Sequence, residues 1–175
     1  MRTKMKTLKT LGGAAAVGLV LAGGSAPAQA QTMTLEQARR QIAPFYEMLN
    51  KPATKDLKAL AEQAMSPDWR SFSNETEFKG REGFVAQVTG FGKLIPDLAW
   101  DIKEVLVDGD RIIVRSEASG TPAGPFFGVQ PTGKGFRIMT IDIHTIKDGK
   151  AVTAHHVEDW AAAIRQLSAR EPTAK

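Results

Sequence analysis

Cysteine is absent from this sequence, and its absence excludes several kinds of chemistry. The chain forms no disulfide bond, has no thiolate nucleophile and lacks the lipid attachment site of a lipoprotein. Aromatic and imidazole side chains are also scarce, with one tyrosine and three histidines. The groups that could act as acids or bases near neutral pH are therefore few.

Long hydrophobic runs are also missing, because the longest apolar stretch, LGGAAAVGLVLAGG, is too short to span a bilayer. It follows a cationic start, MRTKMKTLKT, and precedes Ala28-Gln29-Ala30. This order is typical of a secretory signal peptide with a small-residue cleavage site. We predict that residues 1–30 are removed after Ala30 and that the protein is periplasmic or secreted. An uncleaved N-terminal anchor is the alternative.

The net charge of +4 also depends on this leader. Its removal takes away four of the 23 basic residues and no acidic residue, which leaves 19 basic against 19 acidic side chains. A nearly neutral protein has no general electrostatic attraction for nucleic acid. We therefore expect no nucleic-acid partner and, after cleavage, no membrane partner.

Residues 31–175 are long enough for one domain with a hydrophobic core, which we place at about residues 36–168, with a frayed C-terminal tail. Helical periodicity predicts three helices in its first half. The first begins at a Thr34-x-x-Gln37 capping box and is expected to kink or break at Pro44. Thr54 is the expected cap of the second helix, which includes Met65. The turn-rich stretch SFSNETEFKG separates it from the third, which contains Phe84, Val85, Val88 and Phe91.

After Pro96 the pattern alternates as in strands, and Asp-Gly turns at residues 108–109 and 148–149 predict two hairpins. In the second hairpin one face carries five residues: Phe136, Ile138, Thr140, Asp142 and His144. A closing helix from about Asp159 is expected to bury Trp160, Ile164 and Leu167. Helices followed by antiparallel hairpins predict an α+β fold, with a curved sheet and helices on one face.

The stretch GVQPTGK at residues 128–134 is similar to a nucleotide-binding loop. Such a loop needs Ser or Thr after Gly-Lys and then a helix N-terminus. Here Gly135 follows Lys134, and the next residues alternate as a strand. We interpret the stretch as a glycine-rich connection between strands.

Three stretches carry a family resemblance: PDLAWDIKEVLVDGDRIIVR, SGTPAGPFFGVQPTGKGF and DIHTIKDGK. Over about residues 36–168 the chain resembles the SnoaL-like polyketide cyclases, also called ester cyclases. The resemblance implies the cone-shaped α+β fold of nuclear transport factor two and ketosteroid isomerase, in which a curved antiparallel sheet wraps round three helices. It also implies a mostly apolar pocket for a small hydrophobic molecule, and a homo-oligomer formed through the sheet face.

In the family an aspartate on the last strand acts as the acid/base, and a histidine on the strand before it assists. Counted from the Asp148-Gly149 turn, the family histidine falls at Asp142 and the family aspartate at His156, so the residue types are exchanged. Asp142 could then orient His156 and raise its basicity. The sequence also departs from the family's Glu/Asp-His-Trp run, because residues 153–155 are Thr-Ala-His. Without a catalytic role, His156 would be a partly exposed strand residue, and Asp142 would be satisfied by backbone or by His144.

Tyr46 is the third candidate catalytic residue. Ketosteroid isomerases use a tyrosine to donate to the developing oxyanion, and Tyr46 lies on the apolar face of the first helix. Core packing is its alternative role. The candidate substrate contacts are Trp100, Thr121, Thr140 and His144. We expect no cofactor and no metal ion, because His144, His155 and His156 offer no third inward ligand.

These observations favour a cofactor-independent acid/base enzyme. We expect an aldol-type cyclase or isomerase that acts on a small hydrophobic enolisable carbonyl compound. The alternative is a non-catalytic periplasmic binding module for a small apolar ligand. Fold resemblance alone does not choose between them.

Overall fold

The computed structural model describes residues 33–169 of the chain. The predicted signal peptide and most of the expected C-terminal tail lie outside this range. Among residues 33–169, no helix has the length and apolar character needed to cross a bilayer.

Helix α1 (Leu35–Met48) begins with the predicted capping box, in which the Thr34 hydroxyl accepts from the Gln37 N–H and the Gln37 side chain accepts from the Thr34 N–H. Of the kink or break predicted at Pro44, the break is wrong, because the helix continues to Met48 with Pro44 inside it. Proline removes one backbone hydrogen bond at a cost of about 3 kcal/mol. Burial of Phe45 and Tyr46 in the core offsets this cost.

Helix α2 (Leu57–Ala64) is capped by Asp56, whose side chain accepts from the Ala59 N–H at 3.0 Å. The predicted cap at Thr54 is wrong. Thr54 belongs to a preceding short 3-10 helix, η1 (Pro52–Thr54), where its hydroxyl donates to the Lys51 carbonyl. Both residues are favourable caps, and Asp56 is the one placed directly before the helix.

Two strands lie where the sequence predicted the end of the second helix and a turn-rich stretch: β1 (Met65–Phe72) and β2 (Phe78–Gly80). Met65 starts β1 rather than ending α2. Strand β1 pairs with β6 (Lys150–Glu158), which is distant in the sequence, so local periodicity does not reveal it. Pro67 obscures its pattern further, and β2 has only three residues. Helix α3 (Arg81–Leu94) follows, as predicted.

The two predicted hairpins are confirmed. The first joins β3 (Ala99–Asp108) to β4 (Arg111–Gly120), and the second joins β5 (Phe136–Lys147) to β6. Each turn contains a glycine at positive φ, 59° at Gly109 and 76° at Gly149. The strand order is β2-β1-β6-β5-β4-β3. All neighbours are antiparallel except β1 and β6, so the sheet is mixed rather than wholly antiparallel.

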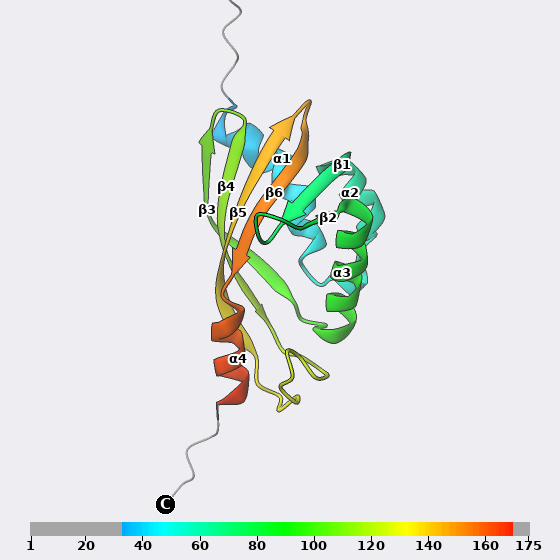
Figure 1. The fold of residues 1–175 in the computed structure, drawn as a ribbon, viewed down its shortest axis with the longest axis vertical. Coiled ribbons are helices and arrows are strands. Elements are labelled where there is room, and N and C mark those ends of the chain that lie inside the picture. Colours follow the sequence, from blue (N-terminus) through cyan, green and yellow to red (C-terminus); the bar gives the residue numbers. More distant parts are fainter. Residues whose placement is uncertain (1–32, 170–175) are drawn as a thin grey trace, which may run out of the picture. The chain divides into compact units, whose positions relative to one another are not determined.

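The sheet is curved, and α1, α2 and α3 lie on one side of it (Figure 1). Its inner face contributes the predicted alternating residues of β5, all of them buried: Phe136, Ile138, Thr140, Asp142 and His144. Helix α4 (Trp160–Ser168) follows β6 and buries Ala163 and Leu167. Trp160 and Ile164, which were predicted to be buried, are partly exposed because α4 covers only the end of the sheet.

The glycine-rich loop leads directly into β5 at Phe136. A strand rather than a helix N-terminus follows Lys134, so the loop lacks the helix dipole that a phosphate loop requires. Gly128 and Gly133 have positive φ, which fits the interpretation as a turning connection.

Candidate functional site

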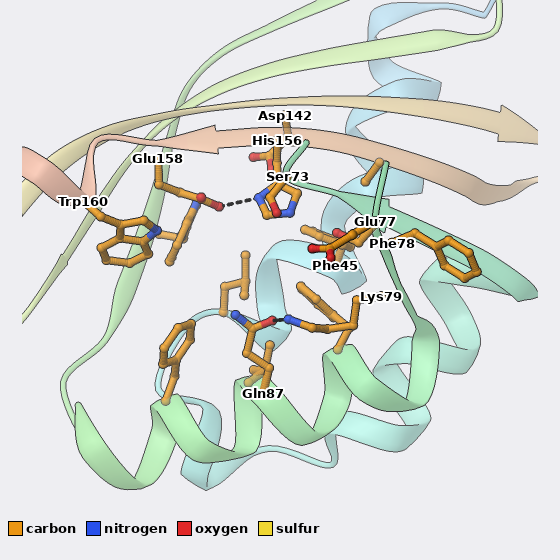
Figure 2. Close-up of a pocket in the computed structure, with 17 residues that line it drawn as sticks. Phe45, Ser73, Glu77, Phe78, Lys79, Gln87, Asp142, His156, Glu158 and Trp160 are labelled. Carbon is orange, nitrogen blue, oxygen red and sulfur yellow. Dashed lines mark hydrogen bonds and ion pairs between the residues drawn. The ribbon is translucent and has the colours of Figure 1, made fainter. Parts of the chain in front are cut away.

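A cavity of about 390 Å³ lies between the inner face of the sheet and helices α1 and α3 (Figure 2). This volume is within the range of small-molecule sites. Much of its wall is aromatic and apolar, and includes Phe45, Leu49, Phe84, Val88, Phe91, Trp100 and Trp160. Such a surface favours a small hydrophobic ligand.

Three ionisable side chains come together on the sheet side of this pocket (Figure 2). Asp142 on β5 lies opposite His156 on β6 in the strand register. Glu158 follows His156 by two residues, so strand alternation places both side chains on the same face. One oxygen or nitrogen from each of the three lies within 4.8 Å of the others.

The side chain that contacts His156 is Glu158 rather than Asp142. Nδ1 of His156 is 2.7 Å from Oε1 of Glu158. Burial lowers the pKa of His156, but the hydrogen bond and negative charge of Glu158, together with the charge of Asp142, outweigh burial, and the pKa is raised. Nε2 of His156 has no hydrogen-bond partner within the described part of the chain and lies beside the cavity.

Sequence reasoning missed Glu158. The signal was present in the two-residue spacing from His156, since strand residues at i and i+2 share a face.

Asp142 is only 5% exposed, at the edge of the cavity. The hydroxyl of Tyr46 donates to its Oδ2 at 2.8 Å. Burial raises the pKa of Asp142 from 3.8 to about 7, although the hydrogen bond from Tyr46 lowers it and the charge of Glu158 adds to the rise. The carboxyl group can therefore hold or release a proton near neutral pH.

Tyr46 lies behind Asp142 and is not among the residues that line the cavity. Its hydroxyl is also 3.2 Å from Nε2 of His144. Burial, with a further contribution from the charge of Asp142, raises the pKa of Tyr46 well above 10. The phenol therefore remains a donor, but its proton is directed at Asp142.

His144 is buried on the inner face of the sheet, where it is 1% exposed. Its ring lies edge-on to Phe45, with 4.7 Å between the ring centroids. Burial lowers the pKa of His144 from 6.5 to about 4, and the nearby His156 contributes. Its Nδ1 has no partner among residues 33–169. The imidazole is therefore neutral at physiological pH and does not border the cavity.

The remaining predicted substrate contacts are in different places. Trp100 lines the cavity, and its Nε1 donates to Oγ1 of Thr140 at 3.1 Å. Thr140 is itself buried behind the indole. Thr121 lies in a separate shallow hollow, where its N–H donates to Asp97. The structure thus brings Trp100 to the pocket with Asp142 and His156, and does not bring Thr121 there.

The donors for a metal ion differ from those considered in the sequence. Of the three histidines, His144 is sealed, and His155 is exposed and stacks on Phe72 at 4.8 Å. Asp142, His156 and Glu158 form the group that could hold a divalent cation, because carboxylate and imidazole ligands suit such ions. In this structure Nδ1 of His156 is already used by Glu158.

Residues 40–167 match the model of the SnoaL-like polyketide cyclase family. A search of curated proteins finds no match. Among solved structures, TsrD from Streptomyces laurentii is 25% identical to the chain, with a TM-score of 0.67 over 78% of this chain and 98% of TsrD.

Two further solved structures are similar. AclR from Streptomyces galilaeus, described as a candidate hydroxylase, is 25% identical, with a TM-score of 0.66 over 77% of this chain and 97% of its own. IdmH from Streptomyces antibioticus, described as a candidate polyketide cyclase, is 24% identical, with a TM-score of 0.66 over 76% and 99% of the two chains. The similarity confirms the predicted α+β cone fold.

Proposed function

Because the chain belongs to the SnoaL-like polyketide cyclase family, we propose that its pocket catalyses proton transfer on a small hydrophobic enolisable carbonyl compound without a cofactor. The observation that carries this proposal is the meeting of Asp142, His156 and Glu158 on one wall of a cavity whose other walls are largely aromatic and apolar. An aldol-type cyclisation or an isomerisation both begin with such a proton transfer.

The different environments of the two central groups suggest how the work is divided. The pKa of Asp142 is about 7, so its carboxylate is a base of suitable strength near neutral pH. The pKa of His156 is raised by Glu158, which favours the protonated ring. Asp142 would remove a C–H proton next to the carbonyl, and the His156 N–H would donate to the oxygen as it becomes an enolate.

This division revises the roles expected from the sequence. Glu158 orients His156, while Tyr46 fixes the carboxylate of Asp142 from behind. Tyr46 is in our proposal a positioning residue rather than the oxyanion donor. The oxyanion donor would be His156, which borders the cavity.

The test is proton–deuterium exchange at the α-carbon of 2-tetralone, a bicyclic enolisable ketone, followed by NMR. We expect the protein to accelerate exchange, and Asp142→Asn to lower the rate by about 10²- to 10⁴-fold, the usual contribution of a general base. His155→Asn is the matched control, because His155 neighbours His156 in sequence but stacks on Phe72, away from the cavity.

The alternative function is a non-catalytic binding module for a small apolar ligand. The exchange of residue types at Asp142 and His156 relative to the family favours it. Saturable binding of 2-tetralone with exchange no faster than in buffer would establish binding and exclude the catalytic proposal for this probe.

We also propose that the protein is exported. The support is the cationic, apolar and small-residue order of residues 1–30. Expressed in a bacterial host, the protein should be recovered from the periplasm with its mass reduced by residues 1–30. Ala30→Trp should block this processing, because the cleavage site requires small residues. Full-length protein in the cytoplasm would contradict the proposal.

Self-association through the outer sheet face is a further part of the proposal. Met139 on β5 and Val157 on β6 are 56% and 62% exposed there and lie on paired neighbouring strands. Light scattering should give a dimer mass that falls to that of a monomer in Met139→Lys. A monomer before substitution would refute this part alone.

A further inference from the structure

One cation faces the pocket from the side opposite the acid/base groups. Lys79 on β2 donates through Nζ to Oε1 of Gln87 on α3. Figure 2 shows this pair across the cavity from Asp142 and His156. Lys79 is the only lysine or arginine among the described residues that line the cavity.

Lys79 is exposed, and it forms no ion pair within the described part of the chain. Its hydrogen-bond partner is a neutral amide, and none of the ion pairs within residues 33–169 involves it. Glu77 lines the same end of the cavity without forming an ion pair with it. The field of Lys79 extends into the pocket, since it acts on His156 and opposes the effect of Glu158 there.

Gln87 presents a second donor beside the ammonium group. Because its Oε1 accepts from Lys79, its amide NH₂ remains, and no acceptor is bound to it in the described part of the chain. An ammonium and an amide NH₂ side by side can each donate to one oxygen of a carboxylate. A carboxylate forms stronger hydrogen bonds with a charged donor than a neutral acceptor does.

We propose that Lys79 and Gln87 bind a carboxylate on the ligand, and that the substrate class is an apolar ring compound bearing an acidic group. This inference rests on the proposed function only because the carboxylate site and the acid/base groups belong to the same pocket. The negative charge of Glu158 repels a carboxylate from the sheet side, while the ammonium of Lys79 attracts it on the opposite side, beside Glu77. The ring then lies against Phe84 and Phe91, with its other end toward Asp142 and His156.

The experiment compares two bicyclic probes that differ in charge, 2-naphthoate and its neutral methyl ester, by isothermal titration calorimetry. We expect the protein to bind 2-naphthoate about three- to tenfold more tightly, the range for a charged hydrogen bond made by an exposed lysine. Lys79→Met should abolish this preference and leave the affinity for the ester unchanged within about twofold. Lys79→Arg should retain the preference.

Lys93→Met is the matched control, because Lys93 is an exposed lysine on α3 that does not line the cavity. It should keep the full preference for 2-naphthoate. Equal binding of the two probes, or a preference that survives in Lys79→Met, would overturn the carboxylate site and leave the acid/base proposal intact. Failure of both probes to bind would overturn the carboxylate site together with the ring-binding pocket that both proposals share.

Discussion

The sealed layer, formed by the buried Tyr46, Thr140 and His144 on the inner side of the sheet, and the open pocket beside it each contain one histidine. The two histidines differ in burial, in pKa and in hydrogen-bond partner. His144 on β5 is enclosed, has a lowered pKa and leaves Nδ1 without a partner among the described residues. His156 on the neighbouring strand β6 borders the cavity, and its pKa is raised by Glu158. A carboxylate partner and access to a ligand therefore separate a structural imidazole from a candidate catalytic one.

Asp142 connects the two regions. Tyr46 and His144 lie behind it in the sealed layer, while its own carboxyl group reaches the pocket. Burial acts on Asp142 and His144 alike by disfavouring the charged form, and so shifts their pKa values in opposite directions. The two side chains therefore affect stability in opposite ways as the pH changes.

The largest effect that we expect is on the pH dependence of the free energy of unfolding. Asp142, with a pKa of about 7 folded against 3.8 unfolded, contributes about 4 kcal/mol that is present below the unfolded value and lost as the pH rises through 7. His144, at about 4 folded against 6.5 unfolded, contributes about 3 kcal/mol that is present above 6.5 and lost as the pH falls toward 4. In the unaltered protein these two dependences nearly cancel.

Substitutions separate the two contributions in urea denaturation at pH 4 and pH 7. Relative to the unaltered protein, Asp142→Asn should lose about 3 kcal/mol more stability between pH 7 and pH 4, because only the His144 contribution remains. His144→Gln, which retains a polar group beside Tyr46, should lose about 3 kcal/mol less. Parallel pH profiles in all three proteins would show that neither group is shifted by burial.

The sequence anticipates the pocket-facing strand well and the packing behind it poorly. Alternation along β5 places Thr140, Asp142 and His144 on one face, and all three are buried there. Alternation is a local property, so one strand is enough to show it. The pairing of β1 with β6 is not local, and it was missed for that reason.

The candidate site shows the same limit at the level of single contacts. The sequence predicts that Tyr46 lies on the inner face of its helix. It does not predict that the Tyr46 hydroxyl donates to the carboxylate of Asp142, 96 residues away. Only the packing of α1 against β5 decides whether the phenol reaches a ligand or Asp142. Thr121 shows the same limit, because the sequence predicted it as a substrate contact and it lies in a hollow separate from the cavity of Asp142 and His156.

A smaller effect should follow when the link between the two regions is broken. Tyr46→Phe removes the hydrogen bond to Asp142, and we expect a loss of about 1–3 kcal/mol in the free energy of unfolding, larger at high pH where Asp142 is ionised. The pKa of Asp142 should rise further, since that hydrogen bond lowers it. Urea denaturation across pH and carboxyl NMR titration measure the two effects.

Thr140→Val is the control for this variant. It removes the acceptor for Trp100, also a buried hydrogen bond, but neither partner titrates. Its loss of stability should therefore be independent of pH. A pH-independent loss in Tyr46→Phe as well would show that the phenol does not interact with an ionisable Asp142.

The smallest effect on stability, and the sharpest contrast between the two histidines, should come from Glu158→Gln. The pair of His156 and Glu158 is partly exposed, so we expect the free energy of unfolding to change by less than about 1 kcal/mol. The pKa of His156 should fall, because the hydrogen bond and charge of Glu158 both raise it. NMR titration of the histidine rings would show this fall at His156, while Glu117→Gln on the outer sheet face should leave the pKa of His156 unchanged.

The opposite outcome would be a raised pKa of His156 that persists in Glu158→Gln. The raising charge would then have to come from Asp142. That result would support the arrangement predicted from the sequence, in which Asp142 orients the imidazole of His156.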